Sequence, residues 1–237
     1  MDFSKGLKFA YGVFETLYYD GTLEYFEEHM TRLNRSLRQL HMDQVEIGPI
    51  KEEALALLSQ SKHKAIRISV YNDKGNHITY ETRSIKNQKS YKVCFSDIKR
   101  HSSNPLLKIK TGAHLNNFLE KQAFLEKGYD EALHFNEKGD LTEGIYTNLF
   151  FVKDGVIHTP HASCGLLEGI FRQKVIEHAK KIGIPVKIGY YNRESIQAAE
   201  EVFLTNSLIK IMPVFELDTF TYKDNIVTKQ LMKEMLS

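Results

Sequence analysis

The stretch that decides the fold is "LKIKTGAHLNNFLEKQAFLEKGYDEALHFNEKGDLTEGIYTNLFF", which runs from Leu107 to Phe151. Two lysines, Lys108 and Lys110, stand before a segment of helical character over about 115–127, and the strand pattern EALHFN follows it. An isolated acid, Glu143, then enters a second apolar strand, thirty-three positions after Lys110 (143 − 110). Either these residues are ordinary surface charges, or both contact the same small molecule.

Working outward from this stretch, helices and strands are mixed on both sides. Asp20-Gly21 and Asp154-Gly155 each separate β-rich segments and predict hairpins, because both turn residues must tolerate positive φ. The remaining patterns predict helices over 27–40, 50–60, 169–182 and 193–200 and at the C-terminus, and strands over 65–72, 91–97, 186–191, 201–206 and 210–215. The first two of these strands flank a polar stretch, Asn72 to Ser90.

Hairpins together with crossovers favour an α/β or α+β protein of two lobes over a single doubly wound sheet. The composition shifts at "KRHSSNP", where Ser, Asn and Pro discourage regular structure. The predicted division is a first lobe over 1–100, a linker over 101–108 and a second lobe over 109–237.

Composition narrows the function classes. The 237 residues are 42% hydrophobic with a formal net charge of +2, so nucleic acid is not an expected partner. No apolar run approaches the roughly 20 residues that span a membrane. Cys94 and Cys164 lie far apart and show no metal-ligand spacing, which favours a reduced, cytoplasmic protein without a bound metal.

Four places could carry chemistry, and each also has a plain structural reading. Lys110 is either a solvated charge or an amine held in a partly desolvated pocket, where it can act as nucleophile and base. Glu143 is either an edge-strand charge or a buried carboxylate. Gly169 precedes a helix whose N-terminus suits an anion, and the turn Thr205–Ser207 could bind phosphate or simply close a hairpin.

Taken in order, these places resemble one family. The motifs are "GVFETL", "HMTRL", "KTG" followed by "DEAL" twenty residues after Lys110 (130 − 110), "LTEGIYTNLFFVKDGVIHTP", "LLEGIFR" and "EVFLTNSLIKIMPV". Together they cover nearly the whole chain, and they resemble the class IV aminotransferases, the fold-type IV enzymes that use pyridoxal 5′-phosphate. The resemblance implies a smaller N-terminal α/β lobe, a larger C-terminal lobe with a mixed-sheet pseudo-barrel, and a homodimer.

The resemblance also implies a role for each motif. Lys110, and not Lys108, is the lysine that forms a Schiff base with the cofactor, and Glu143 contacts its pyridine nitrogen. The phosphate is bound by Arg32, by the backbone N–H groups of Ile170 and Phe171, and by the Asn206-Ser207 turn. The substrate is a small amine.

Two departures bear on specificity. Phe171 stands where family members often have threonine, so one side-chain contact to phosphate is lost. The family's aminotransferases often carry an arginine for the substrate carboxylate, for which this chain offers only Tyr80 and Arg83 as candidates.

The motifs favour one reaction over another. The Asn-Ser-Leu turn at Asn206 and the threonine at Thr16 favour the family's 4-amino-4-deoxychorismate lyases, which release 4-aminobenzoate and pyruvate. The alternative is an aminotransferase that acts on branched-chain or D-amino acids with 2-oxoglutarate. A third reading is a binding protein without turnover, against which Lys110 and Glu143 argue.

Overall fold

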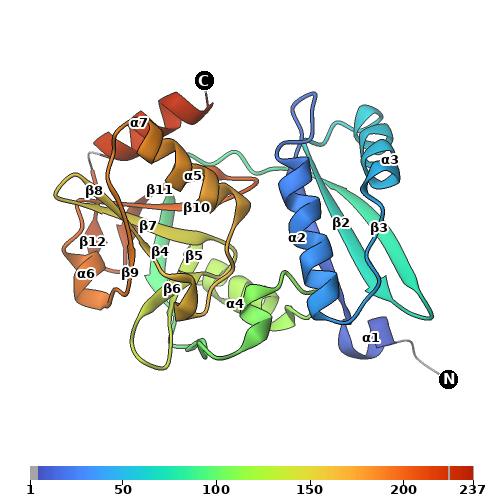
Figure 1. The fold of residues 1–237 in the computed structure, drawn as a ribbon. Coiled ribbons are helices and arrows are strands. Elements are labelled where there is room, and N and C mark those ends of the chain that lie inside the picture. Colours follow the sequence, from blue (N-terminus) through green and yellow to red (C-terminus); the bar gives the residue numbers. More distant parts are fainter. Residues whose placement is uncertain (1–4, 224, 237) are drawn as a thin grey trace. The chain divides into compact units, whose positions relative to one another are not determined.

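The computed structural model describes residues 5–223 and 225–236, and its contacts divide the chain into two compact units (Figure 1). The first unit comprises Met1–Lys86 together with Ile109–His114, and the second comprises Asn87–Lys108 together with Leu115–Ser237. Each unit contains its own sheet and its own helices. The prediction of a mixed α/β protein with two lobes is therefore confirmed.

The chain crosses between the units at other residues than the predicted boundaries at 100 and 109. Strand β4 (Tyr91–Phe95) belongs to the second unit, because it pairs in parallel with β5 (Glu131–Phe135) and β11 (Lys210–Leu217). Residues 109–114 return to the first unit, where the N–H of Phe14 donates to the carbonyl of Lys110 at 2.9 Å. Hydrogen bonding between strands, which composition does not reveal, sets this division.

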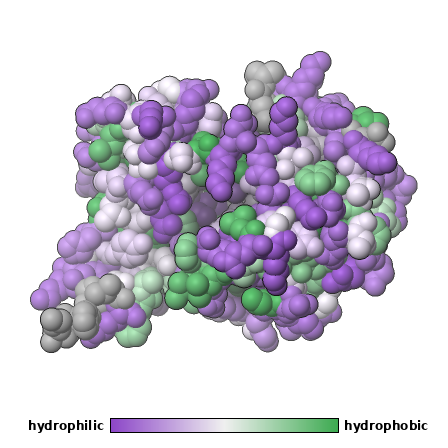
Figure 2. All heavy atoms as spheres, turned by 180° about the vertical axis from the view of Figure 1, so that it is seen from behind, coloured by the Kyte–Doolittle hydropathy of each residue, from purple (hydrophilic) through white to green (hydrophobic). Residues whose placement is uncertain are grey.

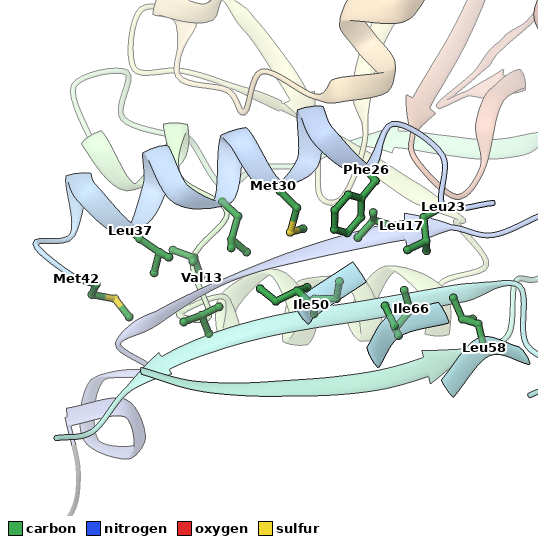
Figure 3. Packing of buried hydrophobic residues seen from close by; sticks show 14 of the residues in the cluster. Val13, Leu17, Leu23, Phe26, Met30, Leu37, Met42, Ile50, Leu58 and Ile66 are labelled. Atoms are coloured by element: carbon green, nitrogen blue, oxygen red, sulfur yellow. The ribbon is translucent and has the colours of Figure 1, made fainter. Parts of the chain in front are cut away.

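The first unit is an antiparallel sheet of β1 (Gly12–Tyr18), β2 (Ala65–Asn72) and β3 (Asn76–Arg83), with β2 in the middle. A short α1 (Lys5–Phe9) precedes it, and α2 (Phe26–Gln39) and α3 (Ile47–Ser59) contribute to its core. Figure 3 shows Phe26, Met30 and Leu37 pointing from α2 toward the strands. Apolar residues spaced three, four and seven positions apart thus bury one face of α2.

Two local predictions in this unit were wrong. Asp20-Gly21 does turn the chain, with Gly21 at a φ of 79°, but no second strand follows, and β1 pairs with β2 instead. Only an isolated bridge joins Tyr19 to Leu23 before α2 begins. The polar stretch after Asn72 contains β3, whose alternating exposure shows that one of its faces is solvated.

The second unit is a nine-stranded sheet in the order β10-β11-β4-β5-β6-β7-β8-β9, with β12 paired to β11. An additional pairing of β10 with β7 closes the sheet on itself, which confirms the predicted pseudo-barrel. The hairpin across Asp154-Gly155 joins β7 to β8 as predicted. The strands not yet bounded are β6 (Leu141–Gly144), β7 (Asn148–Lys153), β8 (Val156–Pro160), β9 (Val186–Gly189), β10 (Glu201–Asn206) and β12 (Phe220–Thr221).

Helices complete the second unit. Helix α5 contacts β10 and β9, and α7 packs on α5, β10 and β11. The helical elements are η1 (Pro105–Lys108), α4 (Leu115–Glu126), η2 (Ala162–Cys164), α5 (Ile170–Lys181), α6 (Arg193–Gln197) and α7 (Ile226–Leu236). The predicted helices after Lys110 and after Gly169 are both confirmed.

The surface is mostly hydrophilic, and Figure 2 shows apolar side chains interrupting it on one face of the molecule. Within residues 5–223 and 225–236, no helix has the length and apolar character required to cross a membrane.

Candidate active site

Lys110 lies beside β1 in the first unit. Its backbone carbonyl accepts from the N–H of Phe14, and its Nζ lies 4.5 Å from the centre of the Phe14 ring. Lys110 is half-buried, whereas Lys108 is exposed and belongs to the second unit. The surroundings therefore favour Lys110 over Lys108 as the reactive amine, because partial desolvation makes an amine a better base and nucleophile.

Thr16 shares a face of β1 with Phe14, and Glu15 points to the opposite face. The register pairs Thr16 with Arg67 of β2 and Glu15 with Ile68, so this alternation continues across the sheet. The guanidinium of Arg67 lies 3.7 Å from the centre of the Phe14 ring. Thr16 and Arg67 thus lie on the same face as Phe14, the ring over which the Lys110 ammonium is placed.

Arg67 was missed by the sequence reasoning. Tyr80 pairs with Ile68 and packs against the core under α2 and α3, so it lies on the other face of the sheet. Arg83 shares the face of Arg67 but is exposed at the end of β3. The signal available in the sequence was a single arginine between Ile66 and Ile68 in an otherwise apolar strand.

Arg32 lies on the opposite side of β1 from Lys110 and is buried in an ion cluster. Its Nε and Nη2 donate to the two carboxylate oxygens of Glu15 at 2.8 and 2.7 Å. The Nδ1 of His29 lies 2.7 Å from the same carboxylate, and all three residues are at most 5% exposed. Burial alone would raise the pKa of Glu15, but the charges and hydrogen bonds of Arg32 and His29 lower it to about 2.

Glu143 of β6 is buried and held by three donors in the second unit. The Nη1 of Arg100 donates to Oε1 at 2.6 Å, while the Nδ2 of Asn148 and the backbone N–H of Leu167 each donate to Oε2 at 3.1 Å. This environment rules out the edge-strand reading, because the side chain is only 7% exposed. Arg100 and Asn148 were not predicted, and no local pattern distinguishes them from surface polar residues.

Strand pairing brings Glu143 close to the other predicted groups of this unit. Glu143 pairs with Asn148 on β7, and Asn148 pairs in turn with Thr205 on β10. A Cβ added to Gly169 would lie 2.1 Å from Oδ1 of Asn148, so only glycine allows this close approach. The start of α5 and the end of β10 are therefore both adjacent to the strand that holds Glu143.

Helix α5 begins at Ile170, and in the described chain no side chain caps it. Its first backbone N–H groups and the positive end of its dipole form an environment suited to an anion. Ile170 is half-buried and Phe171 is buried, so the Phe171 side chain packs inward. Any contribution of these two residues to anion binding comes from their backbone.

The turn after β10 is shaped by the side chain of Asn206. Its Oδ1 accepts from the N–H groups of Leu208 and Ile209, both at 2.9 Å, and its Nδ2 donates to the Tyr146 carbonyl at 3.1 Å. Asn206 thus fixes the turn that presents the half-buried Ser207. Just before it, the buried Oγ1 of Thr205 has no hydrogen-bond partner among the described residues.

The chain belongs to the amino-transferase class IV family, whose family model matches residues 12–217. It is 30% identical over 245 residues to aminodeoxychorismate lyase of Bacillus subtilis, covering 93% of this chain and 82% of that protein. Homologues in this family include both lyases and aminotransferases that use pyridoxal 5′-phosphate, and the chain is an enzyme of this kind.

Solved structures agree with this assignment. A Legionella pneumophila protein proposed to be a 4-amino-4-deoxychorismate lyase superposes with a TM-score of 0.93 at 23% identity, over 100% of this chain and 94% of that one, and supports the fold alone. The Escherichia coli branched-chain aminotransferase gives 0.90 at 25% identity, over 98% and 86%. The branched-chain aminotransferase of T.th. in complex with N-(5′-phosphopyridoxyl)-L-glutamate gives 0.88 at 25%, over the same shares.

The residues present in the second unit fit the family's cofactor. Glu143 offers a buried carboxylate for a ring nitrogen, and the start of α5 offers N–H groups for a phosphate. The hydroxyl of Thr205 is a buried polar group without a partner in the described chain, which a bound polar group would satisfy.

Proposed function

We propose that the chain binds pyridoxal 5′-phosphate and converts 4-amino-4-deoxychorismate to 4-aminobenzoate and pyruvate, a step of folate biosynthesis. The observation that carries the choice of reaction is the placement of Thr16 on the face of Phe14, over whose ring the Lys110 ammonium lies. This placement gives the reactive amine a neighbouring hydroxyl on the same surface. The extent of similarity to the Bacillus subtilis lyase, over 93% of this chain, supports the same reaction.

When bound, the cofactor supplies an electron sink for the bond-breaking step. Lys110 binds its aldehyde carbon through Nζ, and after the substrate amine takes that position, the free amine of Lys110 removes the ring proton next to the substrate nitrogen. Glu143 holds a proton on the pyridine nitrogen and is itself held by Arg100 and Asn148. These two donors fix the orientation of the carboxylate before substrate arrives.

Loss of the enolpyruvyl group requires a proton at its methylene carbon. Lys110 is the proton donor, and the Thr16 hydroxyl orients the departing group by a hydrogen bond. Arg67 lies on the face of Thr16 and binds a substrate carboxylate through its guanidinium. The remaining ring loses its proton to Lys110 and becomes aromatic, so atoms and charge balance without an added oxidant.

Phosphate binding divides between the units in this proposal. The backbone N–H groups at Ile170 and Phe171 and the turn at Asn206-Ser207 act from the second unit. Arg32 acts from the first, where Glu15 holds two of its nitrogens.

An aminotransferase remains the second candidate, because Arg67 and Lys110 serve that chemistry equally well and several relatives are branched-chain aminotransferases. Two incubations discriminate between the reactions. One contains 4-amino-4-deoxychorismate and is followed by the fluorescence of 4-aminobenzoate. The other contains a branched-chain or D-amino acid with 2-oxoglutarate and is followed by glutamate formation. Turnover only in the second incubation would overturn the proposal.

We also propose that the enzyme is a homodimer located in the cytoplasm and that it binds no nucleic acid. The homodimer is inferred from the family resemblance, and the two free, buried cysteines support a reducing compartment. Sedimentation equilibrium of the purified holoenzyme measures the oligomeric state, and a monomer mass at micromolar concentration would contradict the homodimer.

A further inference from the structure

Helix α4 has an unusual distribution of polar and apolar residues. None of its residues, Leu115–Glu126, is buried, and its most exposed large side chains are apolar: Leu115 at 67%, Leu119 at 56% and Phe118 at 51%. Its contact with the sheet is made by polar side chains at positions 117, 120 and 121, which share one face at helical spacing. An apolar stripe therefore does not account for the attachment of α4 to the sheet.

These polar side chains converge on the backbone next to Glu143. The Nδ2 of Asn117 donates to the carbonyl of Ile145 at 2.8 Å. Lys121 pairs with Glu131 at 3.4 Å, and Glu131 accepts the N–H of Ile145 at 2.9 Å. Two of the three contacts thus fix both backbone groups of the residue that stands two positions after Glu143.

The third contact reaches Glu143 through His134. The Nε2 of His134 lies 2.9 and 3.0 Å from the two carboxylate oxygens of Glu120, and its Nδ1 lies 3.3 Å from the carbonyl oxygen of Glu143. A carbonyl can only accept, so Nδ1 is a donor. Glu120 also accepts from Ser96 Oγ at 2.6 Å. Burial raises the pKa of Glu120, but hydrogen bonds from His134 and Ser96 and the charge of Arg100 hold that pKa below its usual value.

The segment around Glu143 needs such contacts because its strand pairing is sparse. Strands β6 and β7 are paired only between Glu143 and Asn148, and the register of β5 with β6 shifts between Leu133 and Phe135. Buried backbone groups that lack a ladder partner must be satisfied by side chains. In this segment, side chains on α4, or bound to it, supply that role.

We propose that His134, held in place by Glu120, is a positioning residue for Glu143. The proposal rests on the proposed function, in which the Glu143 carboxylate binds the pyridine nitrogen of the cofactor. His134 does not touch the cofactor. It fixes the backbone from which the carboxylate projects, and Glu120 fixes the orientation of the imidazole ring. Helix α4 begins five residues after Lys110 (115 − 110), so it connects the chain segment of the reactive lysine with the segment of the ring-binding acid.

Binding of two cofactor forms to the purified apoenzyme tests the proposal. Pyridoxal 5′-phosphate carries the ring nitrogen, and its 1-deaza analogue replaces that nitrogen with C–H. The ratio of the two dissociation constants reports the Glu143 contact without any turnover. Wild-type protein is expected to favour pyridoxal 5′-phosphate, and Glu143→Gln is expected to lose most of this preference.

Three further variants separate positioning from general destabilisation. His134→Gln keeps a donor toward Glu120 but loses the donor to Glu143, and we expect the preference to fall about tenfold. His134→Asn places an amide nitrogen where Nδ1 was, and we expect it to stay within about twofold of wild type. Glu120→Ala releases the imidazole ring and is expected to match His134→Gln, while Glu126→Ala, at an exposed position of the same helix, is the matched control.

The outcomes are distinct. If Glu143→Gln loses the preference while both His134→Gln and Glu120→Ala keep it, the positioning role is overturned and the proposed function stands. Equal losses in His134→Gln and His134→Asn also overturn it, because a donor at the Nδ1 position then makes no difference. If wild-type protein shows no preference at all, the role of Glu143 in the proposed function fails, and the inference fails with it.

Discussion

Replacing Glu15 by glutamine should destabilise the protein strongly and change how its stability depends on pH. In the folded protein the pKa of Glu15 is lowered from 4.5 to about 2, a difference of about 2.5 units. At about 1.4 kcal/mol per unit, the ionised Glu15 contributes roughly 3 kcal/mol to the free energy of unfolding at neutral pH. Glutamine removes this contribution and leaves the buried Arg32 without its counter-charge, so the expected loss is about 3–5 kcal/mol.

The sign of the pH dependence follows from the direction of the shift. A carboxyl group whose pKa is lower in the folded state stabilises the protein above its unfolded pKa, and this stabilisation disappears as pH falls toward the folded pKa. The wild-type protein should therefore lose the Glu15 contribution between about pH 4.5 and about pH 2. The glutamine variant should show a correspondingly smaller decrease over the same interval, because its amide does not titrate.

Urea unfolding followed by far-ultraviolet circular dichroism, repeated from pH 7 downward, measures both effects. Glu81→Gln, on an exposed residue of β3, is the matched control and should stay within about 0.5 kcal/mol of wild type. A loss below about 1 kcal/mol in Glu15→Gln, with an unchanged pH dependence, would refute the reasoning. That result would mean that the unfolding measured does not disrupt the Glu15–Arg32 contact.

Four further substitutions test the proposed site. Lys110→Ala should prevent covalent attachment of the cofactor, and in wild-type protein borohydride reduction with peptide mapping should place the label on Lys110; a label on Lys108 would contradict the assignment. Glu143→Gln should fold and bind cofactor but lose most turnover, and wild-type turnover would exclude its role. Arg32→Ala should weaken cofactor binding by about ten- to a hundred-fold, measured by titration of the apoenzyme, and an unchanged dissociation constant would leave Arg32 a purely structural role. Thr16→Val should lower pyruvate formation about tenfold or more with cofactor absorbance intact, and an unaltered rate would show that the hydroxyl is dispensable.

Much of the fold was accessible from the sequence because long periodic segments carry their own signal. The helices after Lys110 and Gly169 and the hairpin at Asp154-Gly155 were confirmed within a few residues. Strand β3 was missed because half of its side chains are solvated, so its polar letters resemble a loop. The Asp20-Gly21 turn was correctly placed, but its sequence does not reveal that β1 pairs with β2, more than forty positions away.

The candidate site was predicted from motif order, and the structure adds what motif order does not contain. Burial distinguishes Lys110 from Lys108, and strand register places Thr16 opposite Glu15. Arg100, which binds Glu143, lies forty-three positions before it (143 − 100), inside a segment whose composition predicts a linker. Contacts between such distant positions depend on the folded topology, so a single sequence does not reveal them.

The reaction itself provides the most direct test of the account. Purified holoenzyme is incubated with 4-amino-4-deoxychorismate in the absence of any amino acceptor, and pyruvate and 4-aminobenzoate are quantified together. The account predicts that both products form in a one-to-one ratio and that Lys110→Ala protein forms neither above background. Absence of pyruvate from the wild-type reaction, together with conversion of an amino acid and 2-oxoglutarate to a keto acid and glutamate, would contradict the lyase assignment.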